Sequence, residues 1–269
     1  MPTVALCSIS AMDRSLADAA SLAARCGADG LEVTARAPHL DATASLEEVR
    51  AAGDRIGAAG LEVTAYGSYL SIGGDDVEER VAREVARADA LGTRLLRVWA
   101  GHPEGARDEV RDEVVHLLRA AGDAAAESGI EVVVERHNGT LADTVERTEA
   151  LLDAVDRDNV SLNYQVLDGL PLSEASRQPD DARRLIPRSR NFHVKNYRCN
   201  REEGRPLRLG GDLERGVLDY RAILAAAVEA GYRGPYGIEF VAFDARPLEG
   251  KVAESVAFLR RVLAEVGAP

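Results

Sequence analysis

The sequence predicts an α/β protein, a (β/α)8 TIM barrel formed as a single domain by residues 1–269. Strand-like apolar runs alternate strictly with amphipathic helices, which favours parallel strands covered by helices. Eight such units in a chain of 269 residues match the count and length of this barrel. An open doubly wound sheet is the rival fold, but SISAMD (8–13) stands where its Gly-rich phosphate loop would follow the first strand.

The expected strands begin with two near-copies, GADGLEVTA (27–35) and GAAGLEVTA (57–65), in which a glycine suited to a helix end precedes a short apolar run. The same unit recurs at a near-constant spacing, with one longer gap before the last strand. The eight predicted strands are 4–9, 30–35, 61–66, 94–100, 130–135, 160–165, 191–196 and 236–241.

The helices between them have readable starts. Ser45 and Glu48 form a capping box, in which each side chain satisfies a backbone donor of the other. Asp75 precedes one apolar face and Thr140 precedes another, and residues 251–267 predict the last helix. Residues 196–216 show no periodicity, and a loop of this length is usually functional or disordered.

Composition limits the partners and the compartment. A net charge of −12 and a pI near 5.0 disfavour nucleic acid and anionic membranes as partners. Three widely spaced cysteines form no CxxC pair, and no apolar run approaches the ~20 residues needed to span a membrane. The N-terminus does not look like a signal peptide. We therefore expect a soluble cytoplasmic protein. These observations are also compatible with a homo-oligomer.

Polar residues gather where the last four predicted strands end. Active sites of TIM barrels form at these carboxyl ends, and strand residues two apart share a face. The candidates are Glu135 at the end of the fifth strand with His137 two residues on, Gln165 at the end of the sixth, His193 and Lys195 on the seventh, and Glu239 on the eighth.

Four of these residues make a plausible ligand set for one divalent cation. Taken singly, a buried glutamate usually pairs with an arginine, and a lone strand histidine is more often a core residue. Together, Glu135, Gln165, His193 and Glu239 offer two carboxylates, an imidazole and an amide oxygen from consecutive strands. This set favours Mn²⁺ or Mg²⁺ and is compatible with Co²⁺, Fe²⁺ or Zn²⁺.

Several segments resemble the xylose isomerase-like TIM barrels, a family of sugar phosphate isomerases and epimerases that includes inosose and 3-dehydroshikimate dehydratases. They are VVVERHNGTLADT (132–144), NFHVKNY (191–197), GADGLEV (27–33) and the closing segment 209–240. The resemblance implies one divalent cation bound by Glu135, His193 and Glu239. The family's fourth ligand is an aspartate, and Gln165 stands in its place. Three carboxylates and a divalent cation would sum to −1, whereas this ligand set sums to zero. We therefore expect weaker metal binding and a stronger Lewis acid.

The resemblance implies an isomerase or epimerase that acts on a sugar, sugar phosphate or related polyol through an enediolate. Glu135 and Glu239 would exchange the proton on opposite faces of one carbon, while His137 and Lys195 position hydroxyls or polarise a carbonyl. Four arginines of the loop after the seventh strand would bind a phosphate or carboxylate of the substrate: Arg198, Arg201, Arg205 and Arg208. The alternative is that they are only solvated surface residues. Trp99 and Tyr66 would pack against a sugar ring in the site, or they would pack between the strand and helix layers.

Three other functions stay open at this point. A lyase would dehydrate a keto-polyol or a 3-dehydroshikimate-like substrate through the same enolate, with His137 or Lys195 as the acid. A barrel without catalysis would only bind a sugar or a partner, which Gln165 alone favours. The AP-site endonuclease branch needs a His-rich zinc site, and five histidines with a charge of −12 argue against it.

Overall fold

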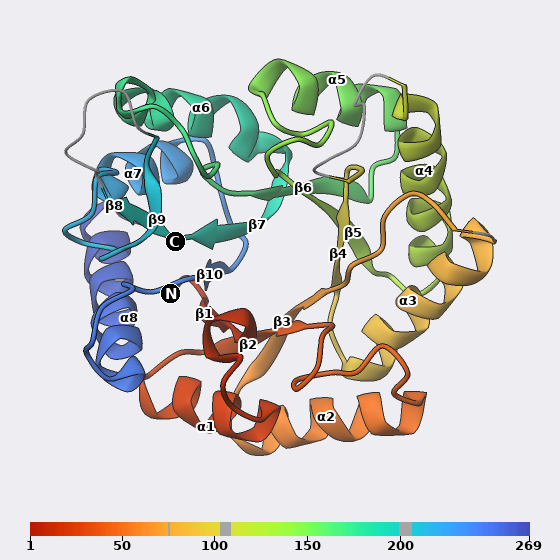
Figure 1. Ribbon diagram of the computed structural model, residues 1–269, viewed down its shortest axis with the longest axis horizontal. Helices are drawn as coiled ribbons and strands as arrows, with labels where there is room; N and C mark the ends of the chain where they lie inside the picture. The colour runs from red at the N-terminus through yellow and green to blue at the C-terminus, as the bar shows by residue number, and fades with distance from the viewer. Residues whose placement is uncertain (75, 103–108, 199–205) are drawn as a thin grey trace.

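In the computed structural model, eight parallel strands close into a barrel, and eight α-helices surround it in the residues that the structure describes, 1–74, 76–102, 109–198 and 206–269 (Figure 1). The barrel strands are β1 (Val4–Cys7), β2 (Gly30–Thr34), β3 (Glu62–Gly67), β4 (Leu95–Trp99), β5 (Glu131–Glu135), β6 (Val160–Tyr164), β7 (Ser189–Val194) and β10 (Tyr236–Ile238). Their order around the barrel is β1-β10-β7-β6-β5-β4-β3-β2, which confirms the predicted fold class.

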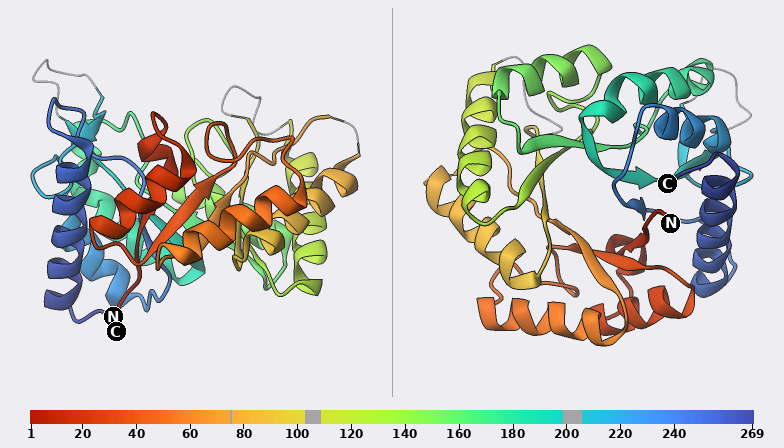
Figure 2. Two further views of the ribbon diagram at one scale, coloured as in Figure 1. Left: turned by 90° about the horizontal axis from the view of Figure 1, so that it is seen from below. Right: turned by 180° about the vertical axis from the view of Figure 1, so that it is seen from behind.

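The helices follow the strands in turn: α1 (Leu16–Arg25), α2 (Leu46–Ala58), α3 (Val77–Leu91), α4 (Arg111–Glu127), α5 (Val145–Val155), α6 (Gln178–Leu185), α7 (Tyr220–Glu229) and α8 (Leu248–Glu265). Short 3-10 helices lie at Ser8–Ala11, Leu172–Arg177 and Ile186–Arg188. The side view shows both termini at one end of the barrel, away from the loops that follow the strands (Figure 2). No helix among the described residues is long and apolar enough to cross a membrane.

Two helix starts show how far capping patterns can be read. The capping box of Ser45 and Glu48 is present at the start of α2, as predicted. The start predicted at Thr140 is wrong, because Thr144 caps α5 and accepts a hydrogen bond from the Arg147 amide. Thr140 instead donates its hydroxyl hydrogen to the carbonyl of His137 at 2.7 Å, closing a turn next to the site. Asp75 lies outside the described residues.

The segment after β7 contains structure that periodicity did not reveal. β8 (Asn196–Arg198) and β9 (Arg208–Gly211) form a two-stranded antiparallel sheet beside the barrel mouth. The strand predicted over 191–196 therefore divides, with His193 inside β7 and Lys195 at the junction between β7 and β8. Gln165 and Glu239 likewise each follow directly after the last residue of their strands.

Candidate metal centre and active site

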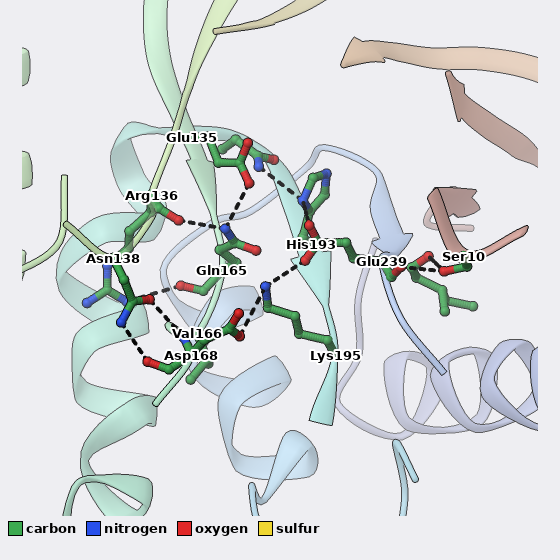
Figure 3. Close-up of polar contacts among 12 residues, drawn as sticks. Ser10, Glu135, Arg136, Asn138, Gln165, Val166, Asp168, His193, Lys195 and Glu239 are labelled. Atoms are coloured by element: carbon green, nitrogen blue, oxygen red, sulfur yellow. Dashed lines mark hydrogen bonds and ion pairs between the residues drawn. The ribbon is translucent and has the colours of Figure 1, made fainter. Parts of the chain in front are cut away.

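The four predicted ligands lie together at the carboxyl end of the barrel. Glu135 ends β5, His193 lies on β7, and Gln165 and Glu239 follow β6 and β10 directly. Each is between 1% and 5% exposed. Ligand atoms of Glu135, His193 and Glu239 all lie within 4.8 Å of one another. Residues from four strands thus converge on one buried point (Figure 3).

Gln165 is held so that its amide oxygen is left without a partner. Its Nε2 donates to Glu135 Oε1 at 3.1 Å and to the carbonyl of Arg136 at 2.6 Å. Gln165 Oε1 is buried and accepts no hydrogen bond from the described residues. The reverse amide orientation would place an oxygen against two acceptors, so the surroundings fix this one. A carboxylate here would meet the same two oxygens, and the pocket therefore suits an amide.

A buried arginine supports Glu135 from the neighbouring strand. Arg97 of β4 is 4% exposed, and its Nη1 lies 2.5 Å from Glu135 Oε2. Its Nε lies 3.9 Å from Glu32 Oε1 on β2, so one guanidinium faces two buried carboxylates. Burial lowers the pKa of Arg97, but Glu135 and Glu32 outweigh this effect and raise it. One carboxylate oxygen of Glu135 thus accepts a hydrogen bond from Arg97, and the other accepts one from Gln165.

Glu239 has a buried cation of its own. Lys195 is 3% exposed, and its Nζ lies 2.7 Å from Glu239 Oε2 and 3.5 Å from Asp168 Oδ1. Burial would raise the pKa of Glu239, but Lys195 and His193 hold it well below its usual range. Burial likewise lowers the pKa of Lys195, and the attraction of Glu239 and Asp168 raises it above its usual value. The two groups therefore form a charged pair (Figure 3).

His193 contacts a carboxylate on each side of its ring. Its Nε2 lies 2.7 Å from Glu32 Oε2, and its Nδ1 lies 3.5 Å from Glu239 Oε1. Burial lowers the pKa of His193, but Glu32 and the neighbouring groups raise it well above the usual value. Asn191 donates to the same oxygen of Glu32 at 2.9 Å.

The residues predicted to contact substrate lie partly at the site and partly on the exposed β8–β9 sheet. The Trp99 and His137 rings, both half-buried, lie 4.7 Å apart at the site, and the exposed Tyr69 stacks on Trp99 at 6.3 Å. Arg198 and Arg208 are exposed on the β8–β9 sheet, and within the described part of the chain neither side chain is hydrogen-bonded or ion-paired to the four ligands. Arg201 and Arg205 lie outside the described residues.

Tyr66 does not wall the site, and this expectation is corrected. It pairs in register with Val33 and Leu96, one residue away from the inward-facing Glu32 and Arg97. Because strand side chains alternate between faces, its ring points outward to the helices. Its hydroxyl lies 2.7 Å from Glu84 of α3, and Arg87 donates to it at 2.9 Å.

Glu32 and Arg97 were not among the sequence candidates, although both belong to the cluster. Each is a charged residue between two apolar ones inside a strand, Leu31-Glu32-Val33 and Leu96-Arg97-Val98. That pattern could have signalled an inward-facing charge. However, Glu62 has the same neighbours and is exposed at the start of β3, so the pattern alone is ambiguous.

The donor set fits a divalent cation. Two carboxylates and one imidazole converge, and the unpartnered Oε1 of Gln165 would supply a fourth donor, an oxygen of the kind that Mg²⁺ and Mn²⁺ accept. Three positive side chains, Arg97, Lys195 and a protonated His193, lie against the three carboxylates of Glu135, Glu239 and Glu32 respectively. Of these, only His193 would have to give up its positive charge to become a ligand.

Comparison with known proteins places these residues in a family. The sequence profile described as Xylose isomerase-like TIM barrel matches residues 20–262. The chain is 30% identical over 131 residues to a 3-dehydroshikimate dehydratase from Bacillus anthracis, covering 47% of this chain and 45% of that protein. It is also 30% identical over 146 residues to an inosose dehydratase from Geobacillus thermodenitrificans, covering 49% and 47%. Each match thus spans a little under half of the curated relative.

Solved structures share the fold at lower sequence identity. A xylose isomerase-like TIM barrel protein from Mycobacterium smegmatis in complex with magnesium has a TM-score of 0.74 at 20% identity, covering 98% of this chain and 97% of that one. An L-ribulose 3-epimerase has a TM-score of 0.75 at 17% identity, with 99% and 96% covered. The closed barrel and the match over residues 20–262 lead to one conclusion: the chain belongs to the xylose isomerase-like TIM barrel family.

Proposed function

We propose that the protein is a divalent-metal-dependent dehydratase, which removes a proton next to a carbonyl and expels a β-hydroxyl as water from a small polyol or hydroxy acid. The observation that carries this proposal is the 2.7 Å contact between Lys195 Nζ and Glu239 Oε2. A base and a proton donor touch one another there, on the same side of the site. The half-length matches to two dehydratases also support it.

The charges around the site favour an anionic intermediate. The carboxylates of Glu32, Glu135 and Glu239 contribute three negative charges, and Arg97 and Lys195 contribute two positive ones. With a divalent cation and a neutral His193, the cluster therefore carries one net positive charge, counted without the partly exposed Asp168. When bound, the cation would polarise the substrate carbonyl and stabilise the negative charge that develops on its oxygen.

The residues then divide the proton transfers. Glu239 takes the proton from the carbon next to the carbonyl, and the electrons of that C–H bond form the enolate. As the enolate collapses, the C–O bond to the β-hydroxyl breaks and Lys195 gives that oxygen a proton, so that water leaves. Glu239 returns its proton to Lys195 across the 2.7 Å contact, which restores both groups. His137 lies beside Trp99 and would position the substrate.

An isomerase or epimerase is the second candidate, because one observation favours it. Glu135 and Glu239 approach the same point from different strands, within the 4.8 Å cluster that they form with His193. Two carboxylates placed in this way could remove and return a proton at one carbon. The epimerase needs Glu135 as a second base, and its ion pair with Arg97 makes it a weaker one.

Substrate tests separate the two reactions. We expect the Mn²⁺-loaded protein to convert 3-dehydroshikimate or 2-keto-inositol into an ultraviolet-absorbing enone or enol, and we expect a chelator to abolish this activity until Mn²⁺ is restored. Exchange of substrate C–H with D₂O that yields an epimer and no absorbing product would favour the epimerase. The absence of both dehydration and exchange over a panel of keto-polyols and keto acids would contradict both reactions.

A further inference from the structure

The ring of His193 lies between two groups of different kinds. On one side, Nδ1 faces the cluster formed with Glu135 and Glu239. On the other side, Nε2 lies 2.7 Å from Glu32 Oε2, which only accepts hydrogen bonds as a carboxylate. A neutral ring in this position therefore carries its hydrogen on Nε2 and keeps a lone pair on Nδ1, where Asn163 Nδ2 donates at 3.2 Å and Glu239 Oε1 lies at 3.5 Å.

Glu32 is itself fixed in place. It is 3% exposed, and the oxygen that faces His193 also accepts a hydrogen bond from Asn191 Nδ2 at 2.9 Å. Its other oxygen lies 3.9 Å from Arg97 Nε, and the same guanidinium contacts Glu135. Arg97 thus connects the carboxylate behind His193 with a carboxylate of the predicted ligand set.

The barrel leaves room for this contact across two strands. β1 and β10 stand between β2, which carries Glu32, and β7, which carries His193. The residues nearest the contact on these strands are small, Cys7 on β1 and Gly237 on β10. A Cβ on Gly237 would lie 2.8 Å from Cys7 Sγ, 3.4 Å from His193 Cδ2 and 3.9 Å from Glu32 Oε2. A methyl group at 237 would clash with Cys7 and lie in ordinary contact with His193 and Glu32, so the glycine leaves space beside the pair.

We infer that Glu32 is a positioning residue for the metal centre, which holds the His193 ring with Nδ1 directed at the cation. This inference rests on the metal site of the proposed function. A carboxylate that accepts the other N–H of a ligating histidine fixes the tautomer and orientation of the ring and raises its basicity. Glu32 acts through His193, and among the described residues it forms no hydrogen bond with Glu135 or Glu239.

Titration calorimetry with Mn²⁺ tests the inference on Glu32→Gln. We expect the dissociation constant to rise by about 10- to 100-fold, the usual cost of losing such a partner. Glu62→Gln is the matched control, because Glu62 occupies the same place in the second near-repeat and is exposed. We expect its affinity to equal that of the unaltered protein. Equal affinity for Glu32→Gln would overturn the positioning role alone, whereas an unaltered protein that binds no Mn²⁺ would overturn the metal site as well.

A second measurement needs no variant and covers the case in which Glu32→Gln does not fold. The chain has five histidines, so the ring nitrogens can be resolved by ¹⁵N NMR of the Zn²⁺-loaded protein. We expect His193 to carry hydrogen on Nε2 and the metal on Nδ1. A hydrogen on Nδ1, or metal on Nε2, would overturn the inference. The Gly237→Ala variant should shift the same His193 signals, because the new Cβ meets its ring.

Discussion

Replacing Lys195 by methionine is expected to lower kcat for dehydration by about 100- to 10,000-fold, the usual contribution of a positioned general acid. The departing hydroxyl loses its proton donor, and Glu239 loses the partner that resets it at 2.7 Å. Mn²⁺ should bind at least as tightly as before, because the substitution removes a positive charge next to a ligand. Steady-state kinetics and calorimetry on the same preparation check both parts.

Lys195→Arg separates charge from proton transfer. Arginine keeps the positive charge beside Glu239 but does not give up a proton, so we expect kcat to remain low. If Lys195→Met retained the original kcat, Lys195 could not be the acid. Full activity in Lys195→Arg would show that a positive charge alone suffices.

The Arg97→Met variant is expected to lose about 3–5 kcal/mol of unfolding free energy, which is the usual cost of leaving a buried charge unpaired. The guanidinium faces Glu135 at 2.5 Å and Glu32 at 3.9 Å, and methionine leaves both carboxylates buried without it. Urea unfolding measures the loss directly. Added Mn²⁺ should recover part of the stability, because a ligand that binds only the folded state stabilises it.

Arg94→Met is the control for this experiment. Arg94 precedes the same strand and is exposed, with one hydrogen bond to the Ser128 carbonyl at 2.8 Å. Its replacement should change the stability by less than about 0.5 kcal/mol, as is usual for surface positions. Equal losses at both positions would contradict the special role of Arg97.

The barrel and the clustering of the four candidate ligands follow from the sequence for one physical reason. Parallel strands bring their carboxyl ends to one edge, so polar residues at the ends of successive strands must meet. Glu135, Gln165, His193 and Glu239 satisfy this rule even though two of them lie just past the last strand residue. An error of one or two residues in a strand boundary does not move them away from that edge.

Placement along and around a strand was harder to predict. Glu32 and Glu62 both lie in the sequence GLEV. Glu62 pairs with Gly30, however, so it lies level with the start of β2, two residues before Glu32. Only Glu32 therefore reaches the cluster. Tyr66 lies near a strand end but on the outward face, because its direction depends on the pleat and not on proximity to the loop. The contacts of Arg97 and Lys195 depend on side chains that meet across strands, which no local pattern contains.

The position of a bound cation tests the proposed centre most directly. Crystals grown with Mn²⁺ should show one strong anomalous peak per chain at the carboxyl end of the barrel. We predict that it lies within coordination distance of Glu135, Glu239, Nδ1 of His193 and Oε1 of Gln165. A structure without such a peak under saturating Mn²⁺, or with a peak that these residues do not ligate, would contradict the centre and the reaction proposed for it.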